Sequence, residues 1–314
     1  MQAWRFTGTH EPLVLAEVDP PTDQPGRVIV DVRAAGLCHS DVGILEDEKW
    51  LANIPVRPVT PGHEIAGVIT SVGDGVEGYA VGDRVAVWPM HEFNGYQVDG
   101  GFAEQASVAQ ESLIPIPDGV SFAHAAAATD SGMTSHQAVM GAAGVTAGTK
   151  VAIIGLGGLG QVGARVAVLN GAELYVAEIN EAVWPMAEEI GAQRVVRSIT
   201  ELEDVGLEAV VDFAGFGDTT ADAVEAIAPG GKVILVGMGR LETTVNTWPL
   251  ILKAVTLQGS VGGTKEDITS VMEWMAKGEL DPLLTKIGFE EIADGIDRLA
   301  KGEVRGRLVS ISEG

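Results

Sequence analysis

The pattern of apolar and polar positions changes character part-way along the chain. Before about residue 125, short apolar runs are separated by turns rich in glycine and proline, and clear examples begin at Gly26, Ile65 and Asp83. Runs of this length, bounded by turn residues, predict short strands. We therefore expect an irregular, mostly β domain in the first part of the chain.

Beyond that point, apolar strand-like runs alternate with helical stretches. The predicted strands are residues 151–154, 173–176, 209–211, 232–236 and 256–260, and the predicted helices include 161–170 and 183–190. Such alternation predicts a parallel sheet with helices on both faces. The last fifty residues return to mixed structure, with predicted helices at 268–277 and 290–301 and a final strand at 306–311.

The change and return of pattern predict an inserted domain. We expect an α/β protein in which a doubly wound parallel sheet, residues 132–262, interrupts a catalytic domain made of residues 1–131 and 263–314. The length of 314 residues agrees with about two domains.

Composition narrows the possible partners. The net charge of -24 disfavours nucleic acid and anionic membranes, since both require a basic surface. Neither a membrane-spanning stretch nor a signal-peptide pattern is evident, so we expect a cytoplasmic protein. Cys38 is the one cysteine in the sequence, which excludes an intramolecular disulfide and a four-cysteine zinc site.

A glycine motif stands between a predicted strand and a predicted helix. Gly155, Gly157 and Gly160 form G-x-G-x-x-G directly after the apolar run 150–154. In this setting the first glycine permits a tight turn, the second lets the backbone approach a pyrophosphate, and the third lets helix and strand pack closely. The helix N-terminus then offers free N–H groups to the phosphates. A plain glycine-rich turn is the alternative.

An acidic residue ends the next predicted strand. Glu178 follows the run 173–177, 23 residues after Gly155, and no basic residue lies among 179–184. A carboxylate there accepts hydrogen bonds from the adenosine ribose and repels a 2′-phosphate. The sequence therefore favours NAD over NADP, with an ordinary surface acid as the alternative.

Two further blocks carry candidate metal ligands. They are G-L-C-H-S-D, residues 36–41, and P-G-H-E-I-A-G, residues 61–67. Taken alone, one cysteine and one histidine this far apart are weak evidence for zinc, because a lone buried cysteine is more often part of a core. Together with G-D-R-V at 82–85, G-G-F-A-E at 100–104 and the glycine motif, they resemble the zinc-dependent alcohol dehydrogenases of the medium-chain dehydrogenase/reductase superfamily.

The resemblance covers nearly the whole chain and implies a GroES-like catalytic domain around a Rossmann domain. It implies one catalytic zinc held by Cys38, His63 and Asp130. Asp130 stands where many members have a cysteine, and a helix cap is its alternative role. By the same resemblance Glu64 lies beneath the metal, and we expect Asp41 to accept a hydrogen bond from the outer nitrogen of His63.

The resemblance also assigns cofactor contacts. Leu159 would pack behind the nicotinamide, backbone groups near Val236, Val261 and Gly263 would hold its amide, and Arg307 would contact the pyrophosphate. The full set of expected NAD contacts is Thr134, Gly155, Gly157, Gly158, Leu159, Gly160, Glu178, Val236, Val261, Gly263 and Arg307.

Two departures from the family pattern stand out. The interval 87–101 is short and has no cysteine, so we expect no structural zinc. Its larger side chains either shape the pocket mouth or pack locally; they are Trp88, Met90, His91, Phe93 and Tyr96. Gly43 stands where many relatives have a relay histidine, so we expect the alcohol proton to pass through Ser40, with His39 as an outlet or a pyrophosphate neighbour.

The resulting prediction is an enzyme that transfers hydride between NAD(H) and a small alcohol or its aldehyde or ketone. The alternatives are a zinc-free quinone or enoyl reductase of the same superfamily and a non-enzymatic NAD-binding protein. We also expect a homodimer or homotetramer, joined through the edge strand near 256–261.

Overall fold

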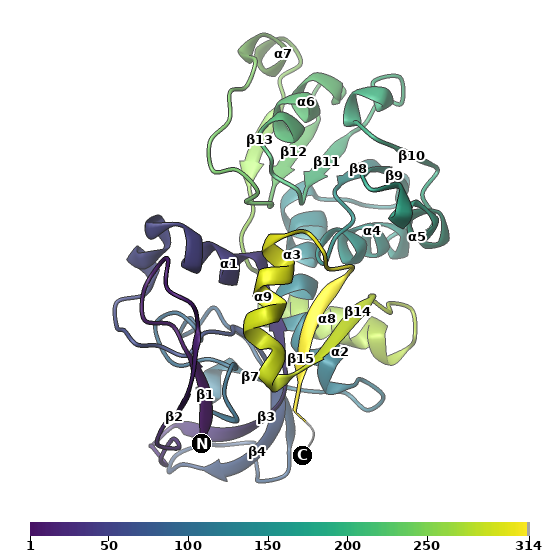
Figure 1. The fold of residues 1–314 in the computed structure, drawn as a ribbon. Helices are drawn as coiled ribbons and strands as arrows, with labels where there is room; N and C mark the ends of the chain where they lie inside the picture. Colours follow the sequence, from purple (N-terminus) through teal and green to yellow (C-terminus); the bar gives the residue numbers. More distant parts are fainter. Residues whose placement is uncertain (313–314) are drawn as a thin grey trace. The chain divides into compact units, whose positions relative to one another are not determined.

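The computed structural model describes residues 1–312. The chain forms two compact units, one made of Met1–Asp130 with the segment from Thr264 onward, and the other of Ser131–Gly263. These divisions lie one residue from the predicted boundaries. Both units can be followed along the coloured ribbon in Figure 1.

The first unit is built on a seven-stranded sheet with the order β14-β15-β3-β4-β5-β7, and β6 also pairs with β3. The pairs are antiparallel except for β14 with β15. The strands are β3 (Arg27–Leu37), β4 (Glu64–Val72), β5 (Arg84–Val87), β6 (Gln105–Ala109), β7 (Leu113–Pro115), β14 (Leu284–Gly288) and β15 (Arg307–Ile311). A separate antiparallel pair is formed by β1 (Gln2–Arg5) and β2 (Val14–Glu17).

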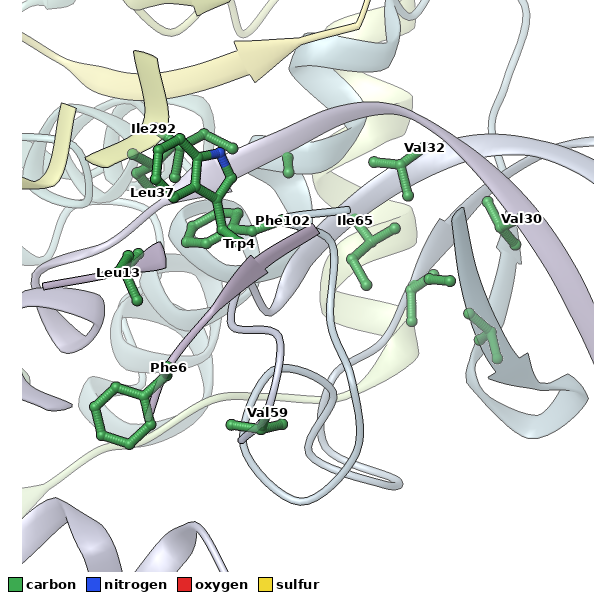
Figure 2. Close-up of a cluster of buried hydrophobic side chains, with 14 of the residues drawn as sticks. Trp4, Phe6, Leu13, Val30, Val32, Leu37, Val59, Ile65, Phe102 and Ile292 are labelled. Carbon is green, nitrogen blue, oxygen red and sulfur yellow. The ribbon is translucent and has the colours of Figure 1, made fainter. Parts of the chain in front are cut away.

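Alternating burial along β3 explains why this sheet has one well-packed core. Val28, Val30 and Val32 are buried, whereas the residues between them are partly exposed. Figure 2 shows how Trp4 and Ile292, from opposite ends of the chain, join the same cluster as Phe102. Because both termini contribute to one core, the two segments of this unit depend on each other for stability.

Four α-helices belong to the first unit: α1 (His39–Glu46), α2 (Phe122–Ala127), α8 (Lys265–Ala276) and α9 (Ile292–Ala300). Helix α1 follows β3 directly and packs against α9. After α2 the chain enters a π-helical turn, η3 (Ala128–Gly132), which contains Asp130. Turns of this kind occur frequently at functional sites.

The second unit has a six-stranded parallel sheet with the order β10-β9-β8-β11-β12-β13. Its strands are β8 (Lys150–Ile154), β9 (Glu173–Ala177), β10 (Arg194–Val196), β11 (Ala209–Asp212), β12 (Lys232–Leu235) and β13 (Thr256–Gly259). Its α-helices are α3 (Met133–His136), α4 (Gly160–Leu169), α5 (Trp184–Ile190), α6 (Asp218–Ala226) and α7 (Thr247–Leu252). Numbered from β8, this is the order 3-2-1-4-5-6 of a doubly wound dinucleotide-binding fold, which confirms the predicted fold class.

Several short strands were not predicted, β10 and β14 among them. Strand β10 has three residues, and β14 has one buried residue, Ile287, among five. Neither offers enough apolar alternation for a periodicity argument, and both form because a neighbouring strand presents an edge. Within residues 1–312, no helix is long and apolar enough to span a membrane.

Candidate metal centre and dinucleotide site

The first candidate ligand lies where a strand becomes a helix. Strand β3 ends at Leu37, and Cys38 is the N-cap residue of α1. The Asp41 carboxylate accepts a hydrogen bond of 2.8 Å from the Cys38 backbone N–H. This capping interaction fixes the backbone that carries the thiol.

The second ligand lies at the start of the neighbouring strand. His63 directly precedes β4, and Gly62 before it has a φ of +92°, a conformation that favours glycine. Gly36 of β3 pairs with Glu64 of β4, and a Cβ at position 36 would lie 2.1 Å from a Glu64 carboxylate oxygen. These two glycines are therefore needed for His63 and Glu64 to take their places.

The candidate ligands converge. One ligand atom from each of Cys38, His63, Glu64 and Asp130 lies within 4.8 Å of the others. The Nε2 atom of His63 is 3.6 Å from Asp130 Oδ2. A thiolate, an imidazole and a carboxylate are a donor set that catalytic zinc uses, with a further position left for water or substrate. The residues present therefore fit a zinc ion.

Asp41 lies next to His63 as expected, but the two are too far apart for the expected hydrogen bond. Asp41 Oδ1 lies 3.7 Å from His63 Nδ1, which is ion-pair distance but too long for a hydrogen bond. The Nδ1 atom is buried and has no hydrogen-bond partner among the described residues. Asp41 is itself only 1% exposed, so it lies beside the outer nitrogen as expected, but its second oxygen is committed to the Cys38 N–H.

Arg307 supplies the positive charge of the cluster. Its side chain is buried at the start of β15, with Nε donating to Glu64 Oε2 at 3.1 Å and Nη2 donating to Glu64 and to Asp130. Burial raises the pKa of Glu64 to about 7, although the Arg307 charge opposes this. Burial also acts to raise the pKa of Asp130, but His63 and Arg307 outweigh it and lower that pKa. The pyrophosphate contact expected of Arg307 stays a prediction.

Ser40 and His39 occupy the first turn of α1. His39 is exposed, and Ser40 is half-buried. Their roles in proton transfer stay predictions.

The sequence left the position of Tyr96 open, and the structure places it beside His63. It was one of five residues with an open choice between pocket mouth and packing, and its ring centroid lies 5.5 Å from that of His63. Among the other four, Phe93 is 40% exposed and His91 approaches Glu111 at 4.0 Å. Only the folded loop reveals which of these aromatic side chains reaches the ligand set.

In the second unit, the glycine motif forms the expected turn. Gly155 has a φ of +83°. A Cβ on Gly160 would lie 1.8 Å from the Gly155 carbonyl oxygen, so helix α4 and strand β8 can approach only with glycine there. A Cβ on Gly157, by contrast, would meet no atom within 4 Å. The backbone at Gly157 is therefore open, as a phosphate-binding turn requires.

Glu178, directly after β9, binds the backbone of this turn through its carboxylate. One carboxylate oxygen accepts from Leu156 N–H at 2.6 Å and the other from Asn180 N–H at 2.7 Å. The Leu159 carbonyl accepts from the Ser135 hydroxyl at 2.9 Å, which anchors the start of α4. The sequence did not indicate this second bond.

The remaining predicted cofactor residues are spread over the second unit. Thr134 is buried in α3, Val236 follows β12 and donates its N–H to Asp212 at 2.9 Å, and Val261 is 83% exposed. Gly158 follows Gly157 in the turn, and Gly263 is the last residue of the unit. Their contacts with NAD stay predictions.

The comparisons with known proteins agree with this geometry. Residues 24–118 match the alcohol dehydrogenase GroES-like domain, and residues 158–277 match the zinc-binding dehydrogenase domain. An alcohol dehydrogenase of Geobacillus stearothermophilus is 32% identical over 95% of this chain and 96% of its own length. This chain belongs to the zinc-containing medium-chain alcohol dehydrogenase family.

Solved structures of the family extend the agreement. The alcohol dehydrogenase of Aeropyrum pernix superposes with a TM-score of 0.91 at 30% identity, covering 99% of this chain and 100% of its own. The acetophenone reductase of Geotrichum candidum, solved in complex with NAD, gives 0.89 at 28% identity, with 99% and 97% coverage. The chain is therefore an oxidoreductase of the alcohol dehydrogenase family across its whole length.

Proposed function

We propose that this protein is a zinc- and NAD-dependent dehydrogenase that interconverts a small alcohol and its aldehyde or ketone. The observation that carries the proposal is the convergence of Cys38, His63 and Asp130, with Glu64, at a single point. A zinc-free reductase of the same superfamily has no need for these ligands, so the cluster favours the zinc-dependent reading. The NAD-bound relative supports the choice of cofactor.

The chain's residues have separable tasks in this reaction. Cys38, His63 and Asp130 would hold zinc, which supplies Lewis acidity that lowers the pKa of a coordinated hydroxyl, while NAD takes up the hydride. The Ser40 hydroxyl would accept the proton of the substrate hydroxyl while passing its own proton on, toward water or His39. Glu64 and Arg307 form a buried, oppositely charged pair that limits the net charge near the ligands.

The second unit would hold the dinucleotide. The open backbone at Gly157 and the N-terminus of α4 suit the pyrophosphate. Glu178 suits the adenosine ribose and disfavours a 2′-phosphate. These features support NAD as the preferred cofactor.

The first experiment measures zinc by elemental analysis in the wild type and in Cys38→Ser, with NADH formation from a panel of small alcohols. We expect about one zinc per wild-type chain, and loss of both zinc and turnover in the variant, because a hydroxyl is a much poorer zinc ligand than a thiolate. Asp118→Asn, which changes an exposed acid, is the matched control and should keep both.

The opposite outcome is equally informative. Full NAD(H)-linked turnover by metal-free protein would contradict the proposal and assign the chain to the zinc-free reductases. Tight NAD binding with zinc present, but without turnover of any alcohol or carbonyl compound, would favour the non-enzymatic alternative.

A further inference from the structure

Asp212 is a buried carboxylate at the carboxyl end of a central strand. It is the last residue of β11, its side chain is 0% exposed, and β11 lies between β8 and β12 in the sheet of the second unit (Figure 1). Burying a carboxylate costs free energy unless its oxygens accept hydrogen bonds. The partners of Asp212 therefore indicate what this side chain does.

Each carboxylate oxygen of Asp212 accepts two hydrogen bonds. Oδ1 accepts from the backbone N–H groups of Ala214, at 3.0 Å, and Gly215, at 2.8 Å. Oδ2 accepts from the hydroxyls of Thr219, at 2.8 Å, and Thr220, at 2.7 Å. The two threonines lie in the first turn of α6, where the helix dipole favours negative charge. The carboxylate thus joins the turn after β11 to the start of α6.

The turn that Asp212 holds lies beside the glycine turn that follows β8. A Cβ on Gly155 would lie 3.2 Å from the Ala214 Cβ and 3.3 Å from the Ala214 backbone nitrogen, which is tighter than most Cβ contacts. Ala214 therefore fills the space next to Gly155, the first glycine of the proposed phosphate-binding turn. Because protein interiors are close-packed, the position of Ala214 limits where the backbone at Gly155 can lie.

The same turn interlocks with the turn after β12. A Cβ on Gly215 would collide with the Gly237 carbonyl oxygen, and a Cβ on Gly237 would collide with the Ala214 carbonyl carbon. The backbone carbonyl of Asp212 accepts from the N–H groups of Val236 and Gly237, each at 2.9 Å. Asp212 is therefore bonded to both turns, through its side chain to one and through its backbone to the other.

We propose that Asp212 is a positioning residue of the NAD site, whose carboxylate holds the turn after β11 in the shape that supports Gly155 and the turn after β12. All three turns lie at the carboxyl edge of the parallel sheet, where dinucleotides bind in this fold. The inference rests on the proposed function, in which the second unit holds NAD. Because its own side chain is buried, Asp212 acts through the backbone of these turns.

Two substitutions at position 212 test the role of the carboxylate. Asp212→Asn keeps the shape of the side chain but removes the charge and one acceptor oxygen, and hydrogen bonds to a charged acceptor are the stronger ones. We expect it to raise Kd for NAD about fivefold, and Asp212→Leu, which keeps no acceptor, to raise it about thirtyfold or more. At saturating NAD the Asp212→Asn variant should keep kcat within about twofold of the wild type, so that the change appears in KM for NAD. Calorimetric titration measures Kd directly.

A variant of the neighbouring core separates positioning from general stability. Val224 is 0% exposed and lies in α6, one helical turn after Thr220. Val224→Ala removes buried methyl groups and should lower Tm, yet it should leave Kd for NAD within about twofold. Hydrogen exchange at the Ala214 and Gly215 amides should become faster in Asp212→Asn and should stay as in the wild type in Val224→Ala.

Three results would overturn the inference: a Kd for Asp212→Asn within twofold of wild type, an equal rise in Kd from Val224→Ala, or unchanged amide exchange at Ala214 and Gly215 in Asp212→Asn. If Asp212→Leu does not fold, the Asp212→Asn variant still decides. A wild-type protein that bound no NAD would instead refute the proposed function, and the inference with it.

Discussion

At the scale of single residues, the candidate metal centre is a cluster of buried charges that nearly balance. Glu64 and Asp130 bring two carboxylates to one place, and Arg307 brings one guanidinium to both. Burying such groups is costly unless each finds an opposite charge. The high pKa of Glu64, about 7, shows that burial outweighs Arg307 at that position. If Cys38 were a thiolate, the cluster would need additional positive charge. A divalent cation would supply it.

Glu178 should decide between the two dinucleotides. Glu178→Gln removes the charge but keeps one acceptor oxygen, so the turn at Leu156 should persist. We expect about a tenfold rise in Kd for NAD, from the loss of charged hydrogen bonds, and a smaller ratio between NADP and NAD because repulsion of the 2′-phosphate is gone. Calorimetric titration with both dinucleotides measures this.

Glu173→Gln, at the exposed start of the same strand, is the matched control and should bind as the wild type does. Tighter binding of NADP than NAD by the wild type would refute the assignment of Glu178.

The sequence identified the candidate ligands but not the side chains that lie around them. The resemblance of its motifs to the zinc-dependent alcohol dehydrogenases selected Cys38, His63 and Asp130, and the fold brings one candidate ligand atom of each together. It was not enough for the pairing of Arg307 with Glu64, because 243 residues separate the two. The choice between pocket mouth and packing stayed open for Tyr96 for a similar reason: its place depends on a loop folding back on Gly62, which no local pattern encodes.

At the scale of elements, the turn between β8 and α4 contains two glycines with different requirements. Gly157→Ala should fold with stability within about 1 kcal/mol of the wild type, because the added methyl meets nothing. It should raise Kd for NAD about tenfold or more, because the methyl occupies the space that the pyrophosphate needs. Thermal unfolding and NAD titration measure the two effects separately.

Gly160→Ala is the contrasting variant. Its methyl would collide with the Gly155 carbonyl, so we expect a loss of more than about 2 kcal/mol of stability. Normal NAD binding by Gly157→Ala would show that the phosphates lie elsewhere. Equal destabilisation by both changes would contradict the distinction between an open and a closed position.

Long elements with strong periodicity were predicted well, and short edge elements were not. The strands around the glycine motif match within a residue or two because their apolar runs are continuous. Strand β10 has three residues and forms only because β9 offers it an edge. Helix α1 was not predicted as an element, since its eight residues show no clear apolar face.

At the scale of the whole molecule, α7 and β13 point to self-association. Trp248, Ile251 and Leu252, spaced as one face of α7, are 64–71% exposed, and β13 is an outer strand of its sheet. We expect a dimer or tetramer, and Ile251→Lys combined with Leu252→Lys should shift it to a smaller species. Light scattering after size exclusion measures the mass.

Val56→Lys with Val81→Lys is the control, because these valines are also exposed but belong to the first unit. It should leave the mass unchanged. A monomeric wild type at micromolar concentration would contradict this expectation. Because the net charge is -24, association should also strengthen as added salt screens repulsion between copies.

Trp50 fills the space beside Gly43, because a Cβ at position 43 would lie 2.6 Å from the indole Nε1 atom. A histidine gained at position 43 would be harmful while the indole remains, and loss of the indole would withdraw the ring on which Tyr96 stacks. Each of the two substitutions is thus unfavourable while the other residue is unchanged. The two positions are therefore coupled, and the free-energy costs of changing them should not be additive.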